Sequence, residues 1–218
     1  EIEINEEQTP ITLESSVLKR LLSKTSFSMA SQDVRYYLNG MLLEIEGNKI
    51  NGVATDGHRL AFSSATTNAA DLDVRNILPR KAVLELSKLL SPNEGTVELL
   101  IGASYVDVRS ENLSFSSKLI DGKYPDYNKV FPTGEPLPLE ISKEILQSAL
   151  SRASVLSNEK YRGVRFQLSE NKLKLTANNP EQESAEEEVD VIYKGSDLEV
   201  GFNIGYLLDV LNSIESEN

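Results

Sequence analysis

The chain has 218 residues, 39% of them hydrophobic, with no cysteine and a formal net charge of −12. This length can bury one large core or two smaller ones, and the lack of cysteine excludes disulfides, thiolate metal sites and a cysteine nucleophile. The acidic balance argues against a protein that coats nucleic acid with its whole surface, since phosphate neutralisation needs a basic face. No apolar run approaches the roughly 20 residues that span a bilayer, and residues 1–4 lack signal-peptide features, so we expect a cytoplasmic location.

The first stretches predict a connector, a helix and a hairpin. Residues 1–10 precede any periodic pattern and are expected to lead from a domain upstream. A helix is predicted over residues 14–27, where Leu18, Leu21 and Leu22 recur at helical spacing. Residues 41–45 and 50–55 alternate around a turn at 46–48, which predicts two antiparallel strands.

A tight turn ends the second of these strands. Residues 54–60 read Ala-Thr-Asp-Gly-His-Arg-Leu and contain the only histidine of the chain. Asp56-Gly57 favours a turn, because glycine accepts a positive φ and aspartate can bond the backbone ahead of it. We therefore expect functional side chains, above all His58 and Arg59, at this strand end.

A second helix and three more strands are predicted further on. Pro79 opens the helix, since proline has no amide hydrogen to leave unsatisfied and its φ is already helical. The expected apolar stripe of this helix is Val83, Leu86, Leu89 and Leu90. Strands are expected over residues 97–101, 105–108 and 113–119.

The chain repeats itself at an offset of 123 residues. The aligned pairs are Gly40 with Gly163, Leu43 with Phe166, Asn48 with Asn171, and Asp56 with Asn179. The second copy predicts helices over 142–156 and 204–214, and strands over 164–168 and 173–177. Together the copies predict an α+β fold of repeated domains, each with two helices packed on antiparallel sheets.

The joint between the copies is expected in residues 121–127, which are rich in Gly, Pro and Asp, with more prolines beyond. The expected organisation is a connector over 1–10, a middle domain over 11–128 and a C-terminal domain over 129–218. The second copy stops just past its second helix, so that domain is expected to be truncated.

Basic residues gather on the two predicted helices of the first copy, while acidic residues concentrate in 181–188. The basic residues are Lys19, Arg20, Lys24, Arg80, Lys81 and Lys88. The plain alternative for each pattern is a solvated face.

Several blocks of sequence together resemble the bacterial DNA polymerase III beta subunit, the replicative sliding clamp. The blocks are residues 32–40, 54–60, 121–127, 157–160 and 177–182. The resemblance implies the DNA clamp fold, with three similar domains per protomer and two protomers closing a homodimeric ring around duplex DNA. It also implies that this chain is the middle domain and most of the third domain. Such a ring confers processivity on the replicative polymerase and needs only weak, sequence-independent phosphate contacts.

The resemblance places a partner-peptide groove between the second and third domains. It implies that the DNA polymerase III catalytic subunit, the clamp loader, other polymerases and repair proteins insert a short peptide there. The matching residues are Leu38, Thr55, Gly57, His58, Arg59, Leu60, Pro125, Lys129, Val130, Asn203 and Tyr206. The counterpart turn at Asn179 has neither histidine nor arginine, so these side chains are no requirement of the fold.

Two further sets of residues follow from the same resemblance. The expected DNA contacts are Gln32, Arg35, Tyr36, Tyr37, Arg80 and Lys81. The expected dimer interface comprises Val155 and Leu156 as its apolar centre, with Glu181, Glu183, Glu186 and Glu187 as acidic partners. Alternatively, Tyr36 and Tyr37 are one core and one surface residue of a strand.

Two other classes of function remain open on the residues alone. Asp56, His58 and the nearby Ser63 and Ser64 allow a small hydrolase-like enzyme, although the chain has no Gly-x-Ser-x-Gly elbow. An acidic interaction scaffold without a DNA role is the other. We expect no catalysis and no cofactor. We also expect no metal, because a single histidine without cysteine makes a poor transition-metal site.

Overall fold

The computed structural model describes residues 10–68, 72–93, 95–158 and 160–218, and the chain divides into two compact units, Glu1–Lys129 and Val130–Asn218. Apart from Pro10, the expected connector lies outside the described residues. Within the described ranges, no helix is long and apolar enough to cross a membrane.

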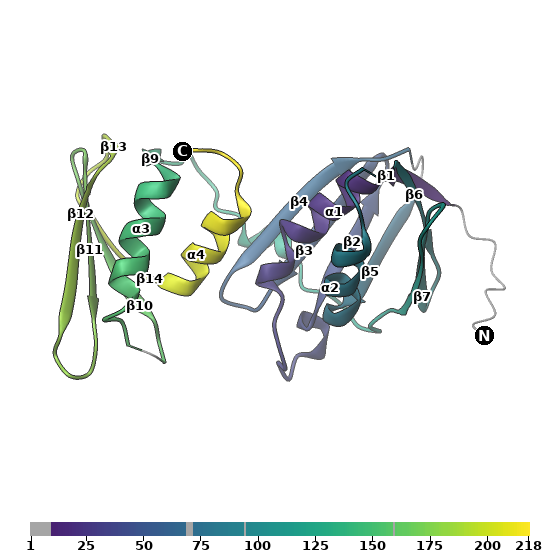
Figure 1. Cartoon of the computed structure of the whole chain (residues 1–218), viewed down its shortest axis with the longest axis horizontal. Coiled ribbons are helices and arrows are strands. Elements are labelled where there is room, and N and C mark those ends of the chain that lie inside the picture. The colour runs from purple at the N-terminus through teal and green to yellow at the C-terminus, as the bar shows by residue number, and fades with distance from the viewer. Residues whose placement is uncertain (1–9, 69–71, 94, 159) are drawn as a thin grey trace. The chain divides into compact units, whose positions relative to one another are not determined.

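The described part of the first unit contains two four-stranded antiparallel sheets and two α-helices (Figure 1). Its first half comprises β1 (Ile11–Glu14), α1 (Ser15–Ser23), η1 (Ser26–Ser28), η2 (Tyr36–Leu38), β2 (Gly40–Glu46), β3 (Lys49–Thr55) and β4 (Leu60–Thr66). Its second half comprises β5 (Asp73–Pro79), α2 (Arg80–Leu89), β6 (Thr96–Ile101), β7 (Tyr105–Arg109) and β8 (Ser114–Lys118), and η3 (Tyr127–Val130) follows.

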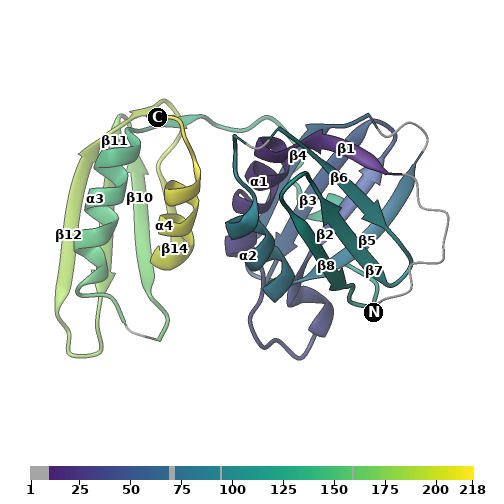
Figure 2. The same cartoon turned by 45° about the vertical axis from the view of Figure 1, so that its right-hand side comes forward.

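The two halves of this unit exchange their first strands. The sheet orders are β1-β6-β7-β8 and β4-β3-β2-β5, so β1 pairs with β6 of the second half and β5 pairs with β2 of the first. Figures 1 and 2 show α1 and α2 side by side against the sheets, and one apolar core joins both helices to both sheets. The predicted α+β fold, with helices packed on antiparallel sheets, is confirmed.

The helices are shorter than predicted, for local reasons. Helix α1 ends at Ser23 and not at residue 27. Just past its end, the Thr25 hydroxyl donates to the carbonyl of Leu21 at 2.8 Å. Pro79 is the last residue of β5 and caps α2, which begins at Arg80. The expectation that Leu89 faces inward is wrong, since it is 50% exposed. The chain turns extended at Leu90, which takes the buried position.

The second unit repeats the pattern of the first half. Its elements are β9 (Leu139–Glu140), α3 (Lys143–Ser154), β10 (Gly163–Ser169), β11 (Lys172–Asn178), β12 (Ser184–Asp190), β13 (Ile192–Tyr193), β14 (Leu198–Asn203) and α4 (Ile204–Ser213). The order β12-β11-β10-β14 matches β4-β3-β2-β5, and the strand pairs begin at Gly40 and Gly163 and at Lys49 and Lys172, 123 residues apart in both cases. Figure 2 shows α3 and α4 against this sheet.

The repeat supplies a matched pair of glycines that we expect to respond differently to alanine. A Cβ at Gly40 would lie 2.4 Å from the carbonyl oxygen of Leu78, whereas a Cβ at Gly163 would meet nothing within 4 Å. Gly40→Ala should therefore lower the free energy of unfolding by about 1–3 kcal/mol. Gly163→Ala should stay within about 0.5 kcal/mol. Denaturant unfolding measures both, and equal effects would contradict the close approach at β2.

Candidate partner-binding and DNA-binding surfaces

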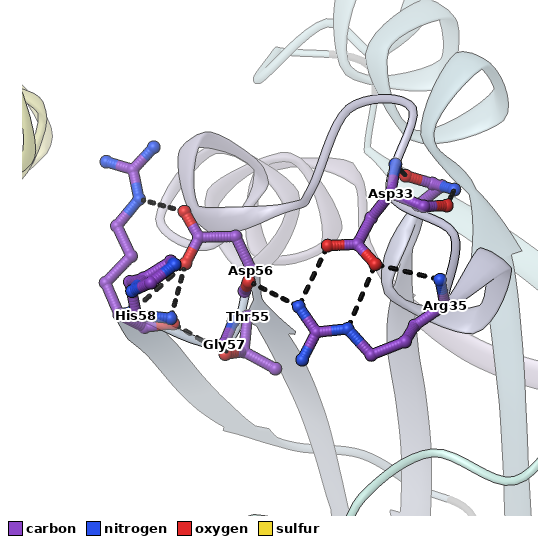
Figure 3. Close-up of polar contacts among 8 residues, drawn as sticks. Asp33, Arg35, Thr55, Asp56, Gly57 and His58 are labelled. Atoms are coloured by element: carbon purple, nitrogen blue, oxygen red, sulfur yellow. Dashed lines mark hydrogen bonds and ion pairs between the residues drawn. The ribbon is translucent and has the colours of Figure 1, made fainter. Parts of the chain in front are cut away.

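The turn between β3 and β4 is organised by the Asp56 carboxylate (Figure 3). Its Oδ1 accepts the amides of His58 at 2.9 Å and Arg59 at 3.1 Å, and its Oδ2 accepts Arg59 Nε at 3.2 Å. The Thr55 hydroxyl closes the turn from the other side, donating to the carbonyl of Arg59 at 2.6 Å and accepting the amide of Gly57 at 3.0 Å. Gly57 has a φ of 90°, a conformation that disfavours any side chain.

The counterpart turn in the second unit uses the aligned residue in the same way. Asn179 Oδ1 accepts the amide of Glu183 at 2.9 Å, as Asp56 Oδ1 accepts amides in the first unit. An amide oxygen suffices for this role. The charge of Asp56 is needed only for its additional partner, Arg59.

Arg59 points into the first unit rather than out of it. Its Nη2 donates to the carbonyl of Phe27 at 2.7 Å, its guanidinium carbon lies 5.7 Å from the centre of the Phe27 ring, and its side chain is 18% exposed. His58 and Gly57 are exposed, while Leu60 is half-buried. The turn therefore presents His58 and backbone to solvent, and Arg59 anchors it.

This geometry leaves little basis for hydrolase chemistry. Both oxygens of Asp56 accept from backbone amides or from Arg59, so the carboxylate is already engaged by groups other than the imidazole. Among the described residues, no group of three or more His, Asp or Glu side chains could hold a metal ion.

Two tyrosines hold the segment that follows β8 against the β4-β3-β2-β5 sheet. The Tyr124 hydroxyl accepts the amide of Thr55 at 3.1 Å, at the start of the turn, and Tyr127 donates a short hydrogen bond to Glu44. Burial raises the pKa of each tyrosine to about 12, and for Tyr127 the neighbouring Glu44 carboxylate adds to the effect. Both phenols therefore stay protonated at neutral pH.

Glu44 is a buried carboxylate that no sequence pattern singles out. It is 5% exposed, and besides Tyr127 it accepts Arg75 Nη1 at 2.6 Å and Asn51 Nδ2 at 3.2 Å. Its position in the middle of β2 puts it under the tyrosine-held segment. It thus fixes the residues that lead to Lys129.

The remaining residues predicted for the groove in the first unit fall into a buried and an exposed set. Leu38 is 2% exposed and packs with Leu42, Tyr124 and Tyr127, with Leu60 at the edge of the cluster. It supports the surface from beneath instead of lining it. Pro125 and Lys129 are exposed, and Lys129 pairs with Asp126 at 3.2 Å, which lowers the pKa of Asp126.

In the second unit, the predicted groove residues lie at the start of α4 and at Val130. Asn203 caps the helix, accepting the amide of Tyr206 at 3.3 Å, and its Nδ2 donates to the carbonyl of Tyr161 at 3.2 Å. Tyr161 was not predicted, yet its side chain is 66% exposed beside Asn203, and Val130 is 64% exposed. The signal for Tyr161 was weak in the sequence, because it lies in a loop without a motif.

The loop before β2 holds four of the predicted DNA contacts and is pinned by its own polar residues. Asn39 Oδ1 accepts the amide of Asp33 at 2.9 Å, and Asn39 Nδ2 donates to the carbonyl of Asp33 at 2.8 Å. Arg35 donates to both oxygens of Asp33, from Nε at 2.9 Å and from Nη2 at 2.8 Å. Its Nη2 also donates to the carbonyl of Asp56 at 3.2 Å, which links the loop to the turn (Figure 3).

The tyrosines of this loop do not lie in a strand. Tyr36 and Tyr37 form the 3-10 turn η2, with their rings edge to face at 5.7 Å, so their interpretation as alternating strand residues is wrong. Tyr36 is 56% exposed and Val34 is 96% exposed, whereas Tyr37 is partly buried against the apolar cluster that contains Leu38. Gln32 is exposed with a φ of 60°.

The Asp33–Arg35 pair makes a prediction about pH. Hydrogen bonds from Arg35 lower the pKa of Asp33 from 3.8 to about 2. A lowered folded-state pKa means that the ionised pair supports the loop above the unfolded value and is lost as pH falls through about 2. The side-chain carbon resonance of Asp33 should titrate near that pH by NMR.

A control is available in the same unit. Arg35→Gln should return the Asp33 midpoint toward its ordinary value and leave Asp126, which is paired with Lys129, unchanged. An ordinary midpoint in the wild type would show that the pair does not form in solution.

Two of the basic residues predicted on the helices donate hydrogen bonds to backbone carbonyls of the first unit. Lys19 Nζ donates to the carbonyl of Leu90 at 2.7 Å, and Arg80 Nη1 donates to the carbonyl of Met29 at 3.1 Å. Arg20 and Lys81 are exposed on the adjacent helices α1 and α2. Positive charge thus persists on this pair of helices after the internal bonds are made.

The residues expected at a dimer interface lie on α3's C-terminal end and along β12. Val155 is 79% exposed and Leu156 is half-buried. Strand β12 is an edge of its sheet, and Glu181, Glu183 and Glu186 are exposed there or just before it.

Several of these carboxylates already have partners in the unit. Arg152 donates to Glu187 at 2.7 and 2.9 Å and lowers the pKa of Glu187, Glu186 pairs with Lys174 at 3.0 Å, and Glu183 accepts Asn179 Nδ2 at 2.6 Å. Any contact of Glu186 or Glu187 with another copy would compete with these pairs.

Comparison with known proteins gives the same result for both units. The family models described as DNA polymerase III beta subunit, central domain, and DNA polymerase III beta subunit, C-terminal domain, match residues 12–126 and 128–218. The beta sliding clamp of Pseudomonas putida is 50% identical over 206 residues, covering 94% of this chain and 56% of that protein. The beta sliding clamp of Escherichia coli K12 is 48% identical over 211 residues, covering 97% of this chain and 58% of that protein.

Solved structures agree with these relatives. The crystal structure of DNA polymerase III subunit beta from Pseudomonas aeruginosa matches with a TM-score of 0.95 at 48% identity, covering all of this chain and 60% of that one. A sliding clamp from the same organism bound to griselimycin also matches with a TM-score of 0.95. The chain spans little more than half the length of the curated relatives it matches.

Proposed function

The chain belongs to the DNA polymerase III beta subunit family, and from that premise we propose that it is part of a sliding clamp that encircles duplex DNA and confers processivity on a replicative polymerase. The observation that carries the proposal is the match of both domain models and of a solved DNA polymerase III subunit beta structure over nearly the whole chain. On this proposal, residues 11–128 are the middle domain, residues 129–218 belong to the C-terminal domain, and residues 1–10 connect to a preceding domain.

The proposed DNA-facing surface consists of the basic helices and the loop before β2. Arg20 and Lys81 are exposed on neighbouring helices, and Arg35 and Gln32 extend from the loop. Guanidinium, ammonium and amide groups can bond phosphate oxygens without reading sequence, and the exposed Tyr36 can stack on an unpaired base. The net charge of the whole chain, −12, limits static binding, which suits a protein that slides.

The proposed partner-binding residues of the first unit lie in the turn at Asp56 and in the segment from Pro125 to Lys129, and those of the second unit are Val130, Asn203 and Tyr206. Short peptides bind such sites through apolar anchors in pockets and through main-chain hydrogen bonds. The turn offers exposed backbone at Gly57 and His58 beside Leu60, with its geometry fixed by Asp56. The polymerase III catalytic subunit, the clamp loader, other polymerases and repair proteins are the proposed partners.

The proposed assembly is a homodimer in a protein of the relatives' full length, with Val155, Leu156 and the carboxylates of β12 at the contact. The proposed location is the cytoplasm, at the nucleoid during replication. We propose no catalytic activity, since the Asp56 carboxylate orients a turn and not a base.

Peptide mapping by NMR tests the groove. A peptide with glutamine, leucine and aromatic anchors should shift the backbone resonances of His58 and Leu60 in the first unit and of Val130 and Tyr206 in the second. Shifts confined to other surfaces, such as the outer face of β10 and β11, would refute the groove.

A further inference from the structure

Arg35 joins the two surfaces proposed above through a shared set of protons. Its Nε and one Nη2 proton go to the carboxylate of Asp33, at 2.9 and 2.8 Å, and its Nη2 also reaches the carbonyl oxygen of Asp56 at 3.2 Å. An Nη2 group has two protons, so both are used. Figure 3 shows the guanidinium between Asp33 on the loop and Asp56 on the turn.

The guanidinium also lies directly on the backbone of the turn. A Cβ at Gly57 would be 2.9 Å from Arg35 Nη1 and 3.0 Å from Nη2. The carbonyl of Asp56 and the amide of Gly57 belong to one planar peptide group. Arg35 therefore holds the orientation of the Asp56–Gly57 peptide group, one residue before His58.

A phosphodiester can reach this arginine only at a cost to that contact. The side of the guanidinium formed by Nε and Nη2 is occupied by Asp33. Bidentate binding of a phosphate at the remaining end needs one proton from Nη1 and one from Nη2, and the second Nη2 proton is the one that Asp56 accepts. The pair with Asp33 can persist while the bond to the turn is exchanged.

We propose that Arg35 is a positioning residue that couples the two sites, so that phosphate binding at the loop releases the Asp56 peptide group and weakens peptide binding at the turn. The coupling rests on the proposed function, because it needs both ligands. By linkage, peptide must weaken DNA binding by the same factor. Exchange of one hydrogen bond from a charged donor at a partly exposed site predicts a factor of about fivefold.

The test is a thermodynamic cycle in which the binding of two ligands, a peptide and a DNA, is measured. The dissociation constant of the fluorescent anchor peptide is measured with and without a saturating primer–template duplex that has a single-stranded overhang, and the DNA is measured with and without peptide. In the wild type, each ligand should raise the dissociation constant of the other about fivefold.

Two variants separate bridging from charge. Arg35→Lys keeps the charge but lacks the planar fork with which Arg35 pairs with Asp33 in a bidentate way and bonds Asp56 at the same time, so the coupling factor should fall to one while DNA still binds. Lys81→Gln removes a charge from α2, away from the turn, so DNA should bind more weakly with the factor unchanged. Faster amide hydrogen exchange at Gly57 on addition of pyrophosphate should accompany the coupling in the wild type and vanish in Arg35→Lys.

The outcomes are distinct. If both probes bind the wild type but neither changes the dissociation constant of the other, the coupling is overturned and the proposed function is left intact. The same fivefold factor in Arg35→Lys also overturns it, because the effect would then not pass through the bridge. Failure of either probe to bind alone overturns the proposed function and the coupling with it.

Discussion

Glu44→Ala is expected to lower the free energy of unfolding of the first unit by about 3–4 kcal/mol, because removing one partner of a buried charged network leaves the others uncompensated. The carboxylate is 5% exposed and accepts from Tyr127, Arg75 and Asn51 at once. Of these partners, Arg75 can turn to water, as its side chain is 46% exposed. The buried hydroxyl of Tyr127 and the amide of Asn51 cannot do so as readily.

Denaturant-induced unfolding measures this change, and hydrogen exchange at the amides of β2 and β3 measures it locally. Glu46→Ala is the matched control, since Glu46 ends the same strand and is exposed, and it should change stability by no more than about 0.5 kcal/mol. Equal effects of the two substitutions would contradict the assignment of Glu44 as the anchor of the segment that leads to Lys129.

His58→Ala combined with Leu60→Ala is expected to weaken binding of the anchor peptide about 30-fold or more, the loss typical of a binding hot spot of about 2 kcal/mol. His58 is exposed at the turn, and Leu60 is the partly buried apolar residue beside it. Neither side chain holds the turn together, because Asp56, Thr55 and Arg59 do so. The turn should therefore keep its shape in the double variant.

Fluorescence anisotropy measures this loss of peptide affinity, and the single variants show how much of it each side chain contributes. His58→Ala should leave stability unchanged, which separates a binding effect from unfolding. Leu84→Ala, a partly exposed apolar substitution on α2, should leave the affinity as it is. An unchanged affinity in the double variant would remove the turn from the groove.

Sequence patterns predicted the fold well where periodicity and the repeat reinforced each other. The offset that aligns Gly40 with Gly163 also aligns the starts of two strands in each unit. Strands β4 and β12 gave less signal, because the first carries serines and the second is an acidic edge strand. The exchange of β1 and β5 between sheets had no signal at all, since strand pairing over long separations leaves no local pattern.

The turn at the candidate site was predictable from the sequence, and the contacts of its side chains were not. Asp56-Gly57 indicated the turn, but Arg59 faces inward to Phe27 and Leu38 lies beneath the surface. These facts depend on which neighbours each side chain meets, and periodicity does not report such contacts. Glu44 escaped notice for the same reason, because an isolated carboxylate in a strand usually faces water.

Retention on DNA of different topology tests the sliding clamp most directly. A protein that carries this chain at the full length of its relatives, loaded onto circular duplex DNA, should remain bound while the circle is closed and should leave rapidly once the DNA is linearised, because a ring is held by topology and slides off free ends. Loss at the same rate from circular and linear DNA would contradict a clamp and favour an acidic scaffold without a DNA role.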